Sequence, residues 1–222
     1  MPPPLAVLFD LDGTLLDTAP NMIAALNVLR REHNLPELPA TQLRSSVSHG
    51  SARLVRVGFP EIAAERLAPL QARFLDIYRA DLSSSTALFP GMEQVLDVLD
   101  ERRVAVGVVT NKPGWLTDPL MSQLGLTSRF ACIVSGDTVA ERKPHPLPLQ
   151  HAAKLAGTAP ASCVYVGDAQ RDIQAARAAG MHALIARYGY IGAEDTPDQW
   201  GGDADLWQPA QLLEWLRGNG RL

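Results

Sequence analysis

Residues 5–17 read LAVLFDLDGTLLD, and this stretch decides the fold class of the 222-residue chain. It begins with a continuous apolar run at residues 5–9 and then changes abruptly to Asp10, Leu11 and Asp12. Continuous apolar runs of this length are typical of strands that are buried on both faces of a parallel sheet. We therefore predict a buried strand with two carboxylates just beyond its carboxyl end.

Outward from this strand, the chain repeats the same pattern. Further apolar runs that end in a polar residue lie at residues 104–109, 130–134, 163–166 and 182–186. Helical patterns separate or follow most of these runs, at residues 92–103, 115–124, 147–156, 173–179 and 209–217. Such alternation of strands and helices predicts an α/β fold with a doubly wound, Rossmann-like core on a parallel sheet.

One long interval breaks this alternation. Between the first predicted strand and the next, the sequence shows no strand signal and has helical patterns at residues 21–31, 41–49 and 61–80. We therefore predict an all-helical domain at residues 16–85, inserted within a core that consists of residues 1–15 and 86–222.

The composition excludes several other classes of protein. Hydrophobic residues make up 46% of the chain, yet no apolar run approaches the roughly 20 residues of a membrane-spanning helix. The net charge of −4 disfavours nucleic acid and anionic membranes as partners. The two cysteines are too few for a disulfide framework or a zinc site, and the N-terminus lacks the basic start of a signal peptide. We expect a cytoplasmic protein with a small-molecule partner, while no pattern bears on its oligomeric state.

The candidate site lies at the carboxyl ends of the predicted strands, because ligands of open α/β sheets bind in the crevice there. The polar residues at these ends are Asp10, Asp12, Thr110, Asn111, Asp137, Asp168 and Asp172. Several carboxylates brought together repel one another, and a hard divalent cation removes that repulsion. Mg²⁺ prefers a few carboxylates together with water and phosphate oxygens, so the pattern predicts Mg²⁺ as the cofactor.

Four short motifs at these positions resemble those of the haloacid dehalogenase superfamily. They are DLDGTLLD at residues 10–17, Thr110-Asn111, Lys143-Pro144, and Gly167-Asp168 with Asp172. They come in the expected order and span nearly the whole chain, although Ala169 stands where some relatives have a second acid. The resemblance implies a Mg²⁺-dependent phosphomonoester hydrolase that works through an aspartyl-phosphate.

The resemblance also implies roles for the motif residues. Asp10 would be the nucleophile that attacks phosphorus, and Asp12 would protonate the leaving group and later deprotonate water. Mg²⁺ would be held by Asp10, by the backbone carbonyl of Asp12, and by Asp168. Lys143 would neutralise charge on both the nucleophile and the phosphate.

The other motif residues would bind the substrate or support the site. Thr110 and Asn111 would bind phosphate oxygens, and Asp172 would orient Lys143 or a water molecule. Asp172 is explained almost equally well as an acid in the first turn of a helix. Lys112 and Asp137 are ambiguous, because each fits either a site role or a purely local one.

The predicted insertion falls where one branch of the superfamily carries a cap domain, which closes over the site and contacts the non-phosphate end of the substrate. Within it, SVSHGSAR at residues 46–53 predicts a loop between helices. We expect His49 to donate to a substrate oxygen and Arg53 or Arg44 to pair with a carboxylate. The alternative for each is a solvated surface residue.

Within this branch, the chain resembles the phosphoglycolate phosphatase group. Its tail at residues 187–201 and its stretch at residues 47–53 are similar to the N-acetylmuramic acid 6-phosphate phosphatases. Both substrates are phosphomonoesters that carry a carboxylate, so the resemblance leaves the choice between them open. We expect the phosphoglycolate type, with the muramic acid type as the alternative.

The same residues bear on the other activities of the superfamily. A phosphonoacetaldehyde hydrolase forms a Schiff base on a lysine of its cap, and residues 16–90 contain no lysine, which excludes this activity. Asp12 argues against a dehalogenase, because a halide leaves without a proton. An isomerase similar to β-phosphoglucomutase shares Asp10 and Asp12 and stays open. A receiver-type phospho-acceptor domain is the non-enzyme alternative, but such domains are much shorter and have adjacent acids.

Overall fold

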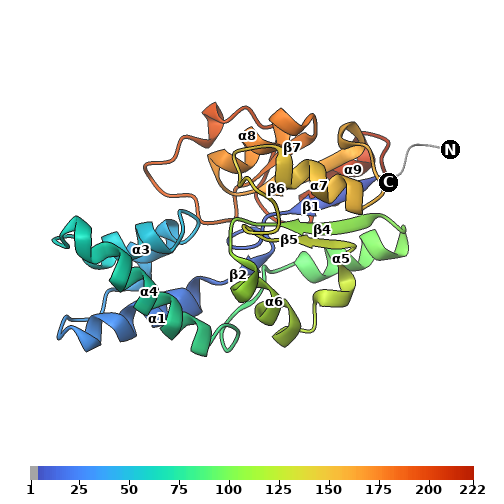
Figure 1. Ribbon diagram of the computed structural model, residues 1–222. Coiled ribbons are helices and arrows are strands. Elements are labelled where there is room, and N and C mark those ends of the chain that lie inside the picture. The colour runs from blue at the N-terminus through green and yellow to red at the C-terminus, as the bar shows by residue number, and fades with distance from the viewer. Residues whose placement is uncertain (1–4) are drawn as a thin grey trace.

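The computed structural model describes residues 5–222, and it confirms the doubly wound α/β core (Figure 1). Residues 1–4, with which the predicted core begins, lie outside the described residues. The strands of the main sheet are β1 (Ala6–Phe9), β4 (Ala105–Val109), β5 (Cys132–Val134), β6 (Cys163–Gly167), β7 (His182–Ala186) and β8 (Ala204–Leu206). All are parallel, in the order β5-β4-β1-β6-β7-β8, which is the order of a Rossmann-type sheet.

The five predicted strands are all present, within a residue or two of their predicted bounds. The edge strand β8 is the one that the sequence does not predict. It has only three residues, and its central residue, Asp205, is exposed, so it contains no apolar run.

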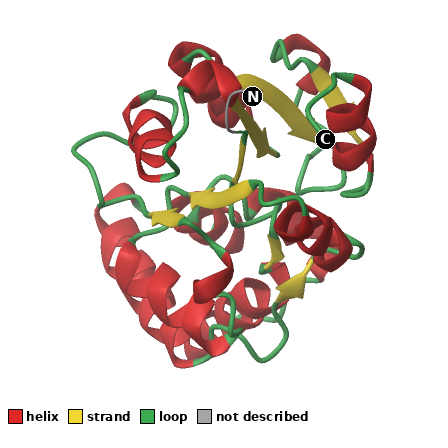
Figure 2. Cartoon of the chain, turned by 90° about the vertical axis from the view of Figure 1, so that its right-hand side faces the viewer, coloured by secondary structure: helices red, strands yellow, loops and turns green. Residues whose placement is uncertain are grey.

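Helices cover both faces of this sheet (Figure 2). On one face, α5 (Met92–Glu101), α6 (Gly114–Gln123) and α9 (Gln211–Gly218) share an apolar core with Val7 and Phe9. On the other, α7 (Leu147–Leu155) and α8 (Gln170–Ala179) share a second core with Ala6 and Leu8. Successive side chains of a strand point to opposite faces, so β1 supplies both cores and needs an apolar residue at every position.

Four α-helices interrupt the described chain between β2 (Leu16–Asp17) and β3 (Ala87–Leu88), which pair with each other in antiparallel fashion. They are α1 (Ala19–Glu32), α2 (Ala40–Leu43), α3 (Ser51–Gly58) and α4 (Ala64–Ala80). We call residues 18–86 the helical insertion. In Figure 1, α1, α3 and α4 lie together to the left of the sheet, with α3 packed against both α1 and α4. None of the described helices combines the length and the apolar character that crossing a membrane requires.

The structure corrects two predictions within the helical insertion. The helix predicted at residues 41–49 ends at Leu43 and continues only as a single 3-10 turn, Arg44–Ser46. The loop predicted at residues 46–53 is shorter, because α3 already begins at Ser51. Gly50, with a φ of +86°, reverses the chain between the two, and glycine adopts this conformation without the penalty that a Cβ would add.

Candidate active site

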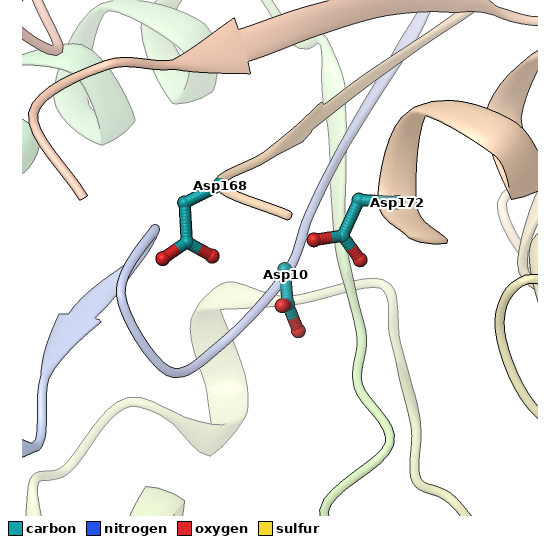
Figure 3. A group of neighbouring side chains, drawn as sticks. All are labelled: Asp10, Asp168 and Asp172. Carbon is teal, nitrogen blue, oxygen red and sulfur yellow. The ribbon is translucent and has the colours of Figure 1, made fainter. Parts of the chain in front are cut away.

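The site lies where the sheet changes its winding direction, between the neighbouring strands β1 and β6. These strands pair in register, with Phe9 beside Val166, so the residues that follow them emerge together. Carboxylate oxygens of Asp10, Asp168 and Asp172 all lie within 4.8 Å of one another, and all three residues are buried (Figure 3). The structure therefore brings together the carboxylates of the first and fourth motifs.

Lys143 is the buried cation of this cluster. Its Nζ lies 2.8 Å from Asp10 Oδ1 and 2.8 Å from Asp172 Oδ1, and it also donates hydrogen bonds to the Tyr165 hydroxyl and to the backbone oxygen of Val109. The contact with Asp172 is an ion pair without hydrogen-bond alignment. One positive charge thus faces two of the three carboxylates.

Burial and the charges of neighbouring carboxylates raise the pKa values of Asp10 and Asp168. The pKa of Asp10 is raised by burial and by the charge of Asp172, against the opposing effect of Lys143. Burial, together with the charges of Asp10 and Asp172, raises the pKa of Asp168 to about 7. Such a group of buried oxygen ligands with excess negative charge fits a hard divalent cation such as Mg²⁺.

Asp10 is held with one oxygen toward its partners. Its Oδ1 accepts a hydrogen bond from the backbone N–H of Leu11 at 2.7 Å and faces Lys143. None of the described residues donates a hydrogen bond to Oδ2, and Asp10 lines the adjoining cleft. The second oxygen is therefore available to a reaction partner.

Both carboxylate oxygens of Asp172 have a partner. Its Oδ2 accepts a hydrogen bond from the backbone N–H of Ala169 at 3.0 Å, which caps the first turn of α8, and its Oδ1 faces Lys143. Asp172 thus lies where it could orient Lys143. A cap of α8 and a contact with the site are compatible, because each uses a different oxygen.

The second motif, Thr110-Asn111, lines the cleft and also holds the loop that carries Lys143. The Asn111 side chain donates to the backbone oxygen of Lys143 at 2.9 Å and accepts from its backbone N–H at 3.0 Å. Thr110 is buried, and its hydroxyl accepts a hydrogen bond from the backbone N–H of Lys112. Both residues line the same cleft as Asp10.

Asp12 extends from the other side of the same turn and meets two donors. The Thr18 hydroxyl donates to Asp12 Oδ1 at 2.6 Å, and Lys112 Nζ donates to the same oxygen at 2.9 Å. Lys112 Nζ also donates to the hydroxyl of Tyr78, on α4 of the helical insertion, at 3.0 Å. Burial lowers the pKa of Lys112, but Asp12 and Tyr78 outweigh it and leave that pKa above its ordinary value. The sequence hinted at this only through the scarcity of lysine, which stands at three positions in the chain.

A cleft of about 520 Å³ opens beside these groups, between the core and the helical insertion. The insertion contributes Ser48, His49 and Tyr78 to its lining, and the core contributes Arg142 and Arg171. The sequence predicted no role for either arginine: Arg171 lies in the polar stretch after β6 without being a motif residue, and Arg142 precedes the motif residue Lys143.

Ser48 joins the insertion directly to the carboxylate cluster. Its hydroxyl donates to Asp168 Oδ2 at 2.5 Å, and its backbone oxygen accepts a hydrogen bond from Arg171 at 2.5 Å. The backbone N–H of Tyr190 donates to the same Asp168 oxygen at 2.9 Å. The loop that ends at Gly50 is thus docked on the fourth motif.

The predicted substrate-reading residues of the insertion separate in the structure. His49 lines the cleft, with Nδ1 3.2 Å from the backbone oxygen of Ser45 and Nε2 3.6 Å from Asp195 Oδ1. Arg53 faces Glu194 at 3.5 Å on the surface, outside the cleft lining. Both side chains are substantially exposed, so neither is fixed by packing.

Two further candidates have local partners. Arg44 pairs with Asp17 at 2.8 Å and lies over the ring of Tyr190 at 4.9 Å, beside β2. Asp137 accepts a hydrogen bond from the backbone N–H of Gly114 at 2.8 Å, at the start of α6, and does not line the cleft.

The fold and this arrangement define an α/β protein with a buried cluster of carboxylates and a lysine beside one cleft, into which Asp10 opens. Comparison with known proteins agrees: residues 7–186 match the model of the family described as haloacid dehalogenase-like hydrolase. The chain belongs to this family.

Similar proteins carry two names. The phosphoglycolate phosphatase of Xanthomonas campestris pv. campestris (strain 8004) is 47% identical over 95% of this chain and 96% of its own. The N-acetylmuramic acid 6-phosphate phosphatase of Pseudomonas putida is 41% identical over 93% of each chain. The crystal structure of a predicted phosphoglycolate phosphatase from Haemophilus somnus superposes with a TM-score of 0.83, at 26% identity, over 96% of this chain and 97% of that one. The protein is therefore an enzyme of the phosphatase class, which excludes the receiver-domain alternative.

Proposed function

We propose that this protein is a Mg²⁺-dependent phosphomonoester hydrolase that acts through an aspartyl-phosphate on Asp10. The observation that carries the proposal is the orientation of Asp10, whose Oδ1 is held by Leu11 and Lys143 while Oδ2 is left toward the cleft. A carboxylate held in this way can act as a nucleophile without losing its charge partner.

In the first step, Asp10 Oδ2 forms a bond to phosphorus, and the bond from phosphorus to the alcohol oxygen breaks. Asp12 gives a proton to that oxygen, so the product leaves as an alcohol. In the second step, Asp12 takes a proton from water, and the resulting attack on phosphorus returns Asp10 and releases phosphate. Lys143 would compensate the negative charge, and Thr110 and Asn111 would bind the phosphate oxygens.

The metal would be held by Asp10, by the backbone carbonyl of Asp12, and by Asp168. Bound there, Mg²⁺ would polarise a phosphoryl oxygen and offset the negative charge of the cluster. We assign Asp172 to Lys143 instead of to the metal, since its Oδ1 lies 2.8 Å from the ammonium group of Lys143 and its Oδ2 caps α8.

The substrate we propose is a small carboxylated phosphoester, of the kind named in phosphoglycolate phosphatases. A second candidate is N-acetylmuramic acid 6-phosphate, and the size of the cleft favours it. Clefts of roughly 300–1,000 Å³ hold ligands of drug size, so a two-carbon phosphoester would leave much of the 520 Å³ to water. Apolar side chains on the lining, among them Leu75 and Trp115, would suit the larger molecule.

The helical insertion, residues 18–86, would act as a cap, within two residues of the predicted bounds 16–85, and the chain on either side of it would form the catalytic core. The docked Ser48 loop and the short β2–β3 pair support this division, because the chain enters and leaves the insertion through neighbouring strands. We place the site of action in the cytoplasm, in keeping with a small-molecule phosphoester as the only partner.

The test is release of phosphate from 2-phosphoglycolate, N-acetylmuramic acid 6-phosphate, glucose 6-phosphate and p-nitrophenyl phosphate, with Mg²⁺ or with EDTA. We expect turnover only with Mg²⁺, and a higher kcat/KM for a carboxylated ester than for glucose 6-phosphate. Asp10→Asn should lower turnover by at least about a thousandfold with the fold intact, because it removes the nucleophile. Asp137→Asn, the same change outside the cleft, is the control and should stay within twofold of the unchanged protein.

Two results would contradict the proposal. Turnover of the Asp10→Asn variant within tenfold of the unchanged protein would remove Asp10 as the nucleophile. Interconversion of hexose phosphates without release of phosphate would indicate the isomerase instead.

A further inference from the structure

Lys112 is a buried cation that the proposed chemistry does not use. Its side chain is only 5% exposed, and its two polar partners come from different parts of the chain, Asp12 in the core and Tyr78 in the helical insertion. Nζ donates to Asp12 Oδ1 at 2.9 Å and to the Tyr78 hydroxyl at 3.0 Å, and it lies 4.7 Å from the centre of the Tyr78 ring. Burying a charged lysine costs free energy unless the charge is paired, so the buried position of Lys112 requires an explanation.

The root of this side chain is fixed. The backbone N–H of Lys112 donates to the Thr110 hydroxyl at 3.1 Å, and its backbone oxygen accepts from Gly136 at 2.8 Å. Pro113 follows directly and restricts the conformation of Lys112 itself. The ammonium group is therefore presented to Asp12 from a rigid turn at the end of β4.

Tyr78 is fixed as well, from the side of the insertion. Its side chain is almost fully buried, and its ring stacks on that of Phe74, with centroids 6.3 Å apart and 9° between the planes. The bond between Lys112 and Tyr78 thus joins a rigid turn of the core to the packed interior of α4.

The pattern of donors on Asp12 has a chemical consequence. Thr18 and Lys112 both donate to Oδ1, and none of the described residues donates to Oδ2. An oxygen that accepts two hydrogen bonds is the poorer place for a proton, so a proton carried by Asp12 belongs on Oδ2. Asp12 lines the cleft, where Oδ2 can give that proton to a leaving group.

We propose that Lys112 is a positioning residue, which orients Asp12 so that its proton sits on the oxygen free to meet the leaving group. Because Lys112 is itself held by Tyr78, this orientation depends on α4 being docked against the core. The acid is then set only when the insertion covers the cleft, and an ester with a poor leaving group is not cleaved before that. This inference rests on the proposed function.

The test compares kcat/KM for an alkyl ester, 2-phosphoglycolate, with that for an aryl ester, p-nitrophenyl phosphate. This constant reports the steps up to formation of the phospho-enzyme, in which Asp12 serves as the acid, and an aryl leaving group needs little protonation. Positioned acid–base groups contribute about 10²–10⁴-fold, so Lys112→Met should lower the alkyl value by about 30-fold or more and the aryl value by about threefold or less. Lys154→Met, on the exposed face of α7, is the matched control and should change neither value.

Two further variants separate positioning from other roles. Tyr78→Phe keeps the ring on Phe74 and removes only the hydroxyl, so it should shift the alkyl-to-aryl ratio in the same direction by a smaller factor, about 3–10-fold. In an Asp12→Asn background, Lys112→Met should cause no further change in the ratio, because residues that act through one group are not additive. If Lys112→Met does not fold, Tyr78→Phe carries the test alone.

Equal losses with both esters would overturn the inference, since Lys112 would then act on the phosphate itself or on the fold. Losses that multiply in the Asp12→Asn background would overturn it as well. The unchanged protein separates this failure from that of the proposed function. If it hydrolyses neither ester with Mg²⁺, the phosphatase proposal fails and the inference falls with it; if it hydrolyses both, only the inference is at stake.

Discussion

At the scale of single residues, several side chains of the site each contact two groups. Lys143 faces Asp10 and Asp172, Asp172 also caps α8, and Asn111 holds the backbone of Lys143 from both sides. The motif spacing predicted that these residues meet, because the carboxyl ends of neighbouring parallel strands share one edge of the sheet. It did not predict the direction of each oxygen, which depends on backbone donors such as Leu11 that no side-chain pattern encodes.

The proposed substrate carries a carboxylate, which an arginine would bind. The sequence predicted Arg53 or Arg44 for this contact, whereas the structure favours Arg142. Arg53 faces Glu194 in solvent, whereas Arg142 lines the cleft, and among the described residues its side chain has only the backbone oxygen of Gly136 as a hydrogen-bond partner. A hydrogen bond to a charged group contributes about 1.5–3 kcal/mol. We therefore expect Arg142→Ala to raise KM for 2-phosphoglycolate by about tenfold or more, and Arg53→Ala to change it by less than about twofold.

Steady-state kinetics with a plain alkyl phosphate provides the control for both variants. Neither substitution should raise KM for that ester, because it carries no carboxylate. The opposite ranking, with a carboxylate-specific loss in Arg53→Ala alone, would restore Arg53 as the reader and require the insertion to move.

At the scale of elements, short segments escaped prediction because their stability comes from contacts rather than from local pattern. The α3 sequence SARLVRVG contains two valines and a terminal glycine, which are poor helix formers, yet α3 packs against both α1 and α4. The paired strands β2 and β3 have two residues each, which is too few to show a periodicity in the sequence. Long segments such as α4 and β4 carry their own pattern and were predicted within a few residues.

Gly58 at the end of α3 makes this dependence testable. A Cβ added there would lie 2.8 Å from Leu26 Cδ1, and Leu26 is fully buried on α1, so it has little room to move. Alanine usually stabilises a helix relative to glycine by about 1 kcal/mol, but overpacking costs about 1–3 kcal/mol. We expect Gly58→Ala to lower the free energy of unfolding by about 1–2 kcal/mol in urea denaturation.

Gly218, the last residue of α9, is the matched control, because nothing lies within 4 Å of a Cβ added there. Gly218→Ala should leave the free energy of unfolding unchanged or raise it slightly. If Gly58→Ala proves as harmless as Gly218→Ala, the packing of α3 on α1 is looser than the structure shows.

At the scale of the whole molecule, the sequence predicted one crevice but not what closes it. Asp10 and Asp168 could be placed together because each follows a predicted strand, and Lys143 could be added through the resemblance of its motif to that of the family. The contacts of Ser48 and Tyr78 with the core could not, because they depend on how an inserted helical unit docks, and this is a property of two surfaces rather than of a local pattern. Arg171 takes part in the same docking, because it donates to the backbone oxygen of Ser48.

The same crevice links the stability of the whole protein to pH when no metal is bound. The pKa of Asp168 is about 7 in the folded protein, against an ordinary value of 3.8. Between these values the folded state holds a proton that the unfolded state does not, so stability falls as pH rises and the loss is complete above about pH 7. Each pKa unit corresponds to about 1.4 kcal/mol, and about 1 kcal/mol shifts Tm by about 2–4 °C at this chain length.

We therefore expect Tm in EDTA to be about 5 °C or more higher at pH 5 than at pH 8, measured by differential scanning calorimetry. Mg²⁺ added at pH 8 should recover most of this difference, because the cation takes over the part of the proton in offsetting the carboxylates. Asp168→Asn is the control: it removes the titrating group, so its Tm should vary less with pH and gain less from Mg²⁺. The expectation would be contradicted if Tm in EDTA stayed level or rose from pH 5 to pH 8 and the Asp168→Asn variant behaved in the same way. The buried carboxylates would then not repel one another as their positions require.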